Sequence, residues 1–270
     1  MAQYRAYVTD YADEVLLWMR HREAQQLPYN GNSPQLSTRG QLVEFLCFVT
    51  EQLKLSVVTT HLAVYLLDRF MDGHHINDSQ LKLTALTAIL VAAKFEEKDM
   101  NVPRIPDLNI FAKNKYGITI FNAMEIFMLK FFNWNVGTVT VAHFAELYLS
   151  VGLSVGDTVS GNTIANTHLT RISLWNYTAR FLDISLHDQG FLQWGNSLVA
   201  AGCVACGRLL CQFNPVWSNT LHRFTGYDLQ ALSEVMNLLI RYHVNEDKNS
   251  ECNTPDSGYT SHCSSLHGTP

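Results

Sequence analysis

The chain has 270 residues, of which 47% are hydrophobic and 16% charged, and its formal net charge is -5. This composition suits one large domain or two ordinary ones and excludes a mostly disordered chain. The mildly acidic balance argues against a broad surface for nucleic acid phosphates. The N-terminus lacks the basic-then-apolar order of a signal peptide, and no apolar run reaches the about 20 residues of a membrane span. We therefore expect an intracellular protein, nuclear and/or cytoplasmic, with reduced thiols, no membrane contact and no direct nucleic acid partner.

The first half of the chain follows a helical hydrophobic period. Tyr11, Val15 and Trp18 recur at helix spacing, and residues 27–34, with two prolines and a glycine, then break the chain. The run at residues 83–93 is apolar almost all round, which is typical of a buried central helix. Further helices are predicted after Ser37, Ser56 and Asn77, after Pro103 and Pro106, and near residues 121–132.

The second half repeats this pattern. Thr140 is expected to open a helix, a polar loop follows at residues 152–162, and residues 197–213 form another run that is small-residue-rich and apolar all round. Two buried helices, each wrapped by amphipathic ones, predict an all-α protein with a duplicated helical module, because few alternating β-branched runs compete with this interpretation. Other helices are predicted at residues 168–182, 188–194 and 229–243.

The composition changes at residue 245. Beyond it Asn, Ser, Thr, Gly, Asp and Pro dominate and apolar residues nearly vanish, so this segment cannot bury enough surface to order itself. The sequence therefore predicts an N-terminal helix and linker at residues 1–36, a first module at 37–137, a second module at 138–244 and a disordered tail at 245–270.

A lysine stands at the end of the first buried helix, in the stretch Ala-Ala-Lys-Phe-Glu-Glu-Lys at residues 92–98. An ammonium group is costly to bury unless other groups accept its protons. Lys94 could simply interact with the carbonyls that end its own helix. Alternatively it could serve a function at the surface, and the residues of this stretch alone leave both interpretations open.

Stretches on either side of Lys94 carry a specific resemblance. Residues 62–70 read Leu-Ala-Val-Tyr-Leu-Leu-Asp-Arg-Phe, and residues 123–130 read Ala-Met-Glu-Ile-Phe-Met-Leu-Lys, followed by Phe-Asn-Trp-Asn at 132–135. With residues 92–98 between them, and in this order, they resemble the cyclin box. The likeness to the cyclin family implies two tandem cyclin-box modules preceded by an N-terminal helix.

The resemblance continues into the second half and covers roughly residues 11–243. Residues 182–186, 197–201 and 221–227 resemble the second cyclin fold. Within the family the chain is most similar to the cyclin J group. That closer likeness rests on residues 33–37, 61–65 and 142–144, and on Trp217 with Leu-His-Arg at 221–223.

The resemblance implies a regulatory role rather than catalysis. In cyclins, the residues that match Lys94 and Glu125 contact the backbone of a cyclin-dependent protein kinase near its regulatory helix. We therefore expect a heterodimer that activates such a kinase in cell-cycle control and reaches substrates through it, with no cofactor. The family's equivalents of Arg39 and Asp68 form an internal salt bridge, so we expect this pair to hold the box together.

Many cell-cycle cyclins dock substrates through an Arg-x-Leu motif in a surface groove. Here Thr38 replaces a methionine, Phe45 a tryptophan, Phe48 an acidic residue and Lys82 a glutamine. Lost negative charge and an added lysine should weaken binding of an arginine-bearing peptide. We expect an altered or unused groove formed by Thr38, Gln41, Leu42, Phe45, Phe48 and Lys82.

The sequence also bears on a metal site, on DNA binding and on other roles of a cyclin fold. Cys203 and Cys206 have CxxC spacing, but they fall inside an apolar helix without a second pair, which favours buried cysteines over a metal site. A cyclin-fold transcription factor that binds DNA would need a zinc ribbon and basic faces, and the sequence shows neither. A cyclin-fold scaffold or a transcription-associated cyclin that does not drive the cell cycle remains the alternative function. Retention of Lys94 and Glu125 argues against a scaffold that has lost kinase activation.

Overall fold

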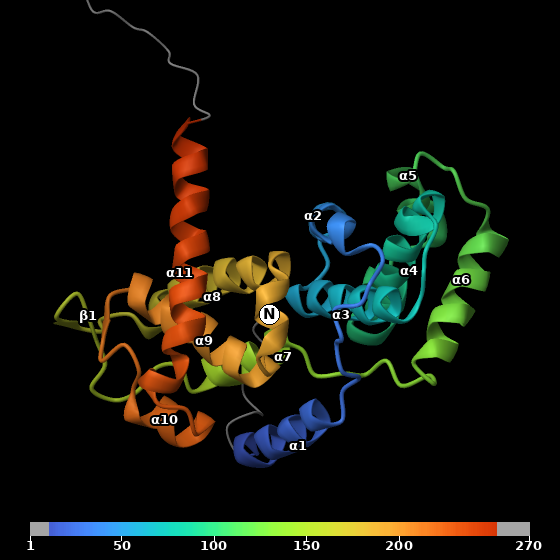
Figure 1. Ribbon diagram of the computed structural model, residues 1–270. Helices are drawn as coiled ribbons and strands as arrows, with labels where there is room; N and C mark the ends of the chain where they lie inside the picture. The colour runs from blue at the N-terminus through green and yellow to red at the C-terminus, as the bar shows by residue number, and fades with distance from the viewer. Residues whose placement is uncertain (1–10, 253–270) are drawn as a thin grey trace, which may run out of the picture.

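The computed structural model describes residues 11–252, with side chains described through residue 245, and is almost entirely helical. Two groups of helices lie side by side, and α1 lies below the second group in the view of Figure 1. The predicted all-α fold with two tandem modules is therefore confirmed. Within residues 11–252, no helix has the length and apolar character needed to cross a membrane.

The first module is built around α4 (Asp78–Glu96), whose residues 83–93 are all buried. The preceding helix, α3 (Val57–Gly73), begins where the sequence predicts it, because the Ser56 hydroxyl accepts a hydrogen bond from the Thr59 amide at 3.1 Å. The other helices are α2 (Arg39–Gln52), α5 (Ile105–Phe111) and α6 (Ile118–Phe131), with 3-10 turns at Leu36–Thr38 and Asp99–Asn101.

The second module is built around α9 (Asn196–Leu210), which is buried along most of its length. The helix predicted at residues 188–194 is a 3-10 turn instead, Gln189–Gln193. The Asp188 carboxylate accepts a hydrogen bond from the Gly190 amide at 2.6 Å and so begins this turn. The other helices are α7 (Val141–Ser150), α8 (Thr167–His187), α10 (Asn219–Thr225) and α11 (Leu229–Cys252).

Two elements of the second module are not predicted by the sequence pattern. The helix α10 is one, and a small antiparallel sheet of order β2-β1-β3 is the other. Each strand has two residues, which is too short for an alternating hydrophobic pattern to show. The strands are β1 (Thr158–Val159), β2 (Asn162–Thr163) and β3 (Phe213–Asn214).

The N-terminal helix α1 (Ala12–Ala24) packs on the second module although it precedes the first in the chain. Its Leu16 and Met19 side chains belong to the second hydrophobic core. The Glu23 carboxylate accepts hydrogen bonds from the Ser197 amide and hydroxyl, each at 2.7 Å, at the start of α9. This helix is therefore part of the second module in space.

The last helix, α11, extends to Cys252, beyond residue 245 where the predicted tail begins. Once a helix is nucleated, each added residue gains one backbone hydrogen bond, so a polar segment can continue it. The C-terminal half of α11 projects away from the body of the molecule (Figure 1). The rest of the predicted tail, residues 253–270, lies outside the described part of the chain.

Candidate functional site

Lys94 lies where the buried α4 reaches the surface. The eleven positions before it, residues 83–93, are all buried, whereas its own side chain is 50% exposed. Lys94 is in the last turn of the helix, where the helix dipole favours a positive charge. Both sequence interpretations of this lysine therefore remain compatible with its position, and its partner decides what it can do.

That partner is Glu125, on α6. The Lys94 ammonium nitrogen donates a hydrogen bond to Glu125 Oε1 at 2.6 Å, and Glu125 is only 13% exposed. Phe121 and Met128, on the same helix, are fully buried and hold α6 against the first core. The structure thus brings together two predicted site residues that are 31 positions apart in the sequence.

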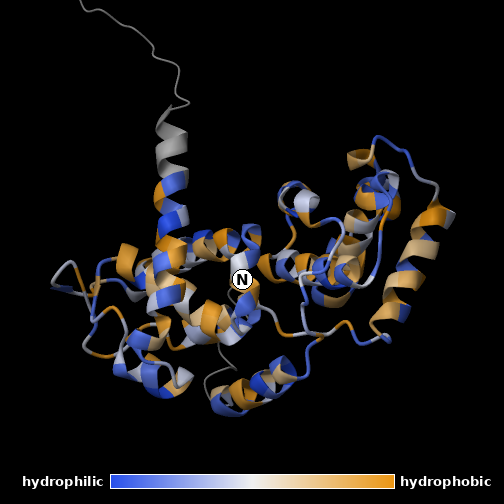
Figure 2. Cartoon of the chain, in the orientation of Figure 1, coloured by the Kyte–Doolittle hydropathy of each residue, from blue (hydrophilic) through white to orange (hydrophobic). Residues whose placement is uncertain are grey.

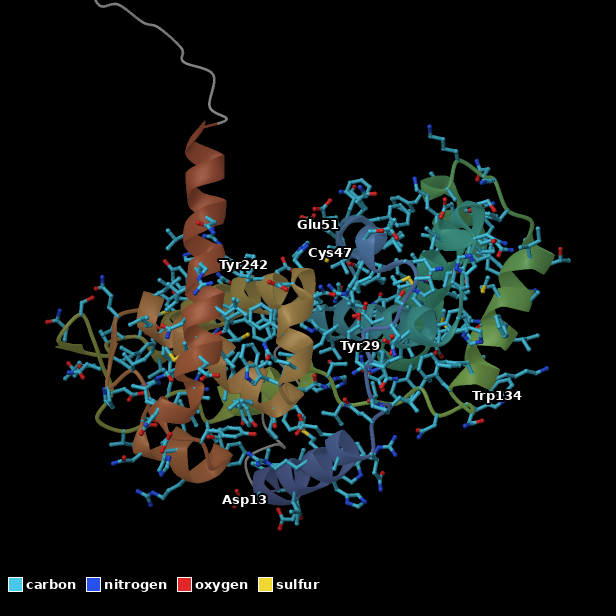
Figure 3. All side chains as sticks on the ribbon, in the orientation of Figure 1. Asp13, Tyr29, Cys47, Glu51, Trp134 and Tyr242 are labelled. Carbon is cyan, nitrogen blue, oxygen red and sulfur yellow. The ribbon has the colours of Figure 1, made fainter. Side chains whose placement is uncertain are left out.

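Large apolar side chains are exposed in the same segments of the chain as this pair. Figure 2 shows α6 as a largely hydrophobic helix at the outer edge of the first module, and Figure 3 labels Trp134 at its end. Four large side chains here, Phe95, Ile126, Phe127 and Trp134, are each more than two-fifths exposed. An exposed apolar surface that surrounds a few polar groups is typical of a protein interface.

The linker between the modules supports this surface. A Cβ atom at Gly137 would lie 2.5 Å from the Phe95 ring, so the ring can pack there only because residue 137 is a glycine. Arg22 of α1 donates a hydrogen bond to the Gly137 carbonyl at 2.7 Å. The N-terminal helix therefore fixes the linker against which Phe95 lies.

Arg39 and Asp68 form a buried, two-pronged ion pair, with nitrogen–oxygen distances of 2.8 and 2.9 Å. The guanidinium also donates to the carbonyls of Leu186 and His187, at 3.1 and 3.0 Å, at the end of α8. The resemblance to the cyclin family predicts that these two residues pair within the first cyclin box. The structure adds a contact to the second module, so the pair also joins the two modules.

The six groove positions lie on or beside α2 and at the start of α4. Phe45 is half-buried, and the Lys82 ammonium nitrogen lies 5.3 Å from the centre of its ring. Phe48 is exposed and meets Phe111 edge to face, with ring centres 6.0 Å apart. Leu42 is 6% exposed and belongs to the first core, whereas Gln41 is exposed and the Thr38 hydroxyl donates to the Gln35 carbonyl at 2.9 Å.

Sequence reasoning missed a buried cation in the second module. Arg208, in the last turn of α9, is fully buried and pairs with Asp157 at 2.9 and 3.0 Å. The guanidinium also donates to the carbonyls of Gly152, Pro215 and Val216. The available signal was a lone arginine within a run of small apolar residues, which calls for a buried acidic partner.

The cysteines of the CxxC spacing are packing residues. Cys203 and Cys206 are both fully buried within α9, as the helix interpretation predicts. Burial raises the pKa of the Cys206 thiol to about 12 and raises that of Cys203 as well, so neither is ready to act as a thiolate. Among residues 11–252, no group of His, Cys, Asp and Glu side chains is arranged to hold a metal ion.

Comparison with known proteins identifies the family. Residues 14–137 match the family model described as "Cyclin, N-terminal domain", and residues 139–265 match "Cyclin, C-terminal domain". The two matches together span most of the chain, and the helical architecture agrees with them. The protein belongs to the cyclin family.

Among the relatives, the chain is similar to Cyclin-J of Xenopus laevis, with 37% identity over 85% of this chain and 61% of that protein. Cyclin-J of Homo sapiens is 35% identical over 85% of this chain and 60% of its own length. The chain therefore spans about three-fifths of the length of these curated relatives.

Solved structures share the fold at low sequence identity. The X-ray structure of a viral cyclin from herpesvirus saimiri has a TM-score of 0.69 and 15% identity, and the match covers 88% of this chain and 97% of that one. A chain in the CAK complex of Chaetomium thermophilum has a TM-score of 0.55 and 11% identity, covering 90% of this chain and 77% of that one.

Proposed function

We propose that this protein is a regulatory subunit that binds a cyclin-dependent protein kinase and activates it in cell-cycle control. The observation that carries the proposal is the Lys94–Glu125 pair, with large exposed apolar side chains on the same segments, Phe95 and Ile126. These two residues match the family positions that contact the kinase. Such a regulatory subunit would act in the nucleus, in the cytoplasm or in both.

The pair is chemically suited to hold a peptide backbone. A lysine ammonium has three protons to donate, and Lys94 uses one of them on Glu125 Oε1. The second oxygen of Glu125 has no hydrogen-bond partner among the described residues. An ammonium can donate to carbonyls of a bound segment while a carboxylate accepts from its amides, and neither contact depends on the segment's side chains.

Binding of this kind can activate a kinase without any chemistry in the cyclin chain. In protein kinases, a Lys–Glu ion pair forms only when the regulatory helix is in place, and it aligns the ATP phosphates. A partner that binds better to the kinase with this helix inward shifts the population toward the active state. The exposed side chains Phe95, Ile126 and Phe127 would supply the apolar contact area of this interface.

We also propose that the substrate-docking groove is altered. Lys82 lies over the Phe45 ring, so the surface already holds a cation where an arginine-bearing peptide would bring a second one. A standard Arg-x-Leu peptide should therefore bind weakly. Tight binding that is lost on Leu42→Ala would contradict this part of the proposal.

The test is co-purification of the full chain with a panel of cyclin-dependent kinases, followed by a kinase activity assay. Lys94→Ala and Glu125→Ala should each weaken association, whereas Lys98→Ala, which removes a nearby exposed lysine, should not. If no kinase associates, the proposed function is wrong. If a kinase binds but both variants bind equally well, the site is wrong, and binding without activation would instead indicate a scaffold.

A further inference from the structure

A cavity of about 50 Å³ lies between the two modules. The α3 helix supplies one wall, and Thr140, Ser185, Leu186 and Phe191 supply the other from the second module. The cavity is separate from the Lys94–Glu125 surface, and none of those surface residues lines it. The proposed kinase-binding residues therefore do not account for the polar groups that line this cavity.

His61 presents an unsatisfied polar atom in this region. The residue lines the cavity and is only 3% exposed, and its Nε2 atom has no hydrogen-bond partner among the described residues. Burial, with a smaller contribution from His143, lowers the pKa of His61 to about 3, so the imidazole is neutral at physiological pH. A buried polar nitrogen without a partner is costly, which points to a ligand that the cavity accepts.

Arg69 provides a second unsatisfied group at the same cavity. Its guanidinium carbon lies 5.1 Å and 5.0 Å from the ring centres of Tyr29 and Tyr65, and its Nε donates to the Leu27 carbonyl at 2.8 Å. These contacts hold the guanidinium in place. The buried Nη1 atom nevertheless has no acceptor among the described residues.

The remaining charged groups of the cavity are already satisfied. Arg39 and Asp68 also line it, and they neutralise each other in their two-pronged ion pair. Among the lining residues there are thus two arginines against one aspartate, and a further carboxylate, Asp72, lies close to Tyr29 without lining the cavity. The missing element is an acceptor with negative charge.

We propose that this cavity between the modules binds a small oxyanion, a carboxylate or phosphate group, which accepts hydrogen bonds from Arg69 Nη1 and His61 Nε2. The unpartnered Arg69 Nη1 donor selects an acceptor, and neutral His61 donates to it as well when its Nε2 carries the ring proton. The excess of positive charge among the lining residues selects an anion. Because the walls come from both modules, a bound oxyanion would also stabilise their contact.

The test is an NMR titration of the full chain with sodium acetate and, separately, with inorganic phosphate, at constant ionic strength. The side-chain nitrogen resonances of the histidines are followed, and His61 is assigned by its loss in His61→Gln. A saturable shift of the His61 resonance is expected with at least one anion, and the comparison of the two anions shows which oxyanion the cavity prefers.

Three arginine and lysine variants separate a site from general charge effects. Arg69→Gln should weaken the apparent affinity by about tenfold or more, because it removes a charged hydrogen bond. Arg69→Lys keeps the charge but loses the fixed Nη1 donor, and a clear loss of affinity is expected here as well. Lys98→Gln, a matched loss of one exposed charge, should change nothing.

The outcomes are decisive even if a variant is unstable. A wild-type chain that shows no saturable His61 shift with either anion overturns the proposal. So does an equal loss of affinity in Arg69→Gln and Lys98→Gln, because it would indicate screening alone. Neither result bears on kinase association, so this inference and the proposed function can fail separately.

Discussion

The two cyclin modules each end their buried central helix with a basic residue, and they use it in opposite ways. Lys94 in α4 is half-exposed and is paired with one oxygen of Glu125. Arg208 in α9 is fully buried, and all five of its N–H donors are used on Asp157 and three carbonyls. A cation that is completely satisfied inside the molecule stabilises it, whereas one left half-satisfied at the surface is available to a partner.

The largest effect is expected from Arg208→Met. This change leaves Asp157 as an uncompensated buried charge and removes donors from three carbonyls, so the free energy of unfolding should fall by about 3–5 kcal/mol. Denaturant unfolding followed by circular dichroism measures it. The double variant Arg208→Met with Asp157→Leu should recover part of the lost free energy of unfolding. If Arg208→Met alone lowers the free energy of unfolding by less than about 1 kcal/mol, Arg208 does not stabilise the module more than Lys94 does.

The next effect concerns binding rather than stability. Lys94→Ala should weaken kinase association by tenfold or more, since a hydrogen bond to a charged group contributes about 1.5–3 kcal/mol. Isothermal titration calorimetry with the kinase found in the pull-down measures the change. Lys98→Ala is the control, and an equal loss in both variants would mean that general charge, not this pair, matters.

The buried His61 gives a third comparison, because burial keeps this imidazole neutral, whereas Arg208 is buried in its charged form. The unfolded chain has a His61 pKa near 6.5 and the folded chain one of about 3, so only the unfolded state takes up this proton between those values. The free energy of unfolding should therefore fall as pH drops below 6.5, by up to about 1.4 kcal/mol per pH unit from this group. Unfolding of His61→Gln between pH 7 and pH 5 should lack this component, and identical pH slopes in both chains would contradict it.

The smallest effect is the change that Lys94→Ala makes to the free chain. An exposed ion pair contributes about 0.2–1 kcal/mol, so the free energy of unfolding should change by no more than this. Thermal unfolding of the purified variant measures it. A loss as large as that of Arg208→Met would show that Lys94 is structural and that its effect on binding is indirect.

Local signals predicted most of the fold. Ser56 and Asn77 stand before α3 and α4 where the sequence places them, and the apolar runs at residues 83–93 and 197–213 correspond to the two buried helices. The short strands and α10 were missed because elements of two to seven residues carry little periodic pattern. The sequence did not predict the extension of α11 to Cys252. The polar composition after residue 245 indicates that this segment buries little apolar surface, but it does not indicate whether the preceding helix continues into it.

The candidate site likewise has residues that the sequence identified and contacts that only the tertiary structure shows. The sequence and its resemblance identified Lys94 with Glu125 and Arg39 with Asp68, and the structure shows both pairs in contact. The link from Arg39 to the end of α8 depends on how the modules sit together, which no local pattern encodes. Asp157 lies in a polar loop 51 residues before Arg208, so that pairing also required the tertiary structure.

The position of α1 has a consequence for synthesis of the chain. Leu16 and Met19 leave the ribosome well before the residues of the core that they join, which include Phe144, Phe181 and Val204. The N-terminal helix α1 therefore has no complete docking surface until α7 and α9 have emerged, which is after the whole first module has been made. Docking of α1 is therefore a late step of folding, because it requires residues of the second module and of the linker between the modules.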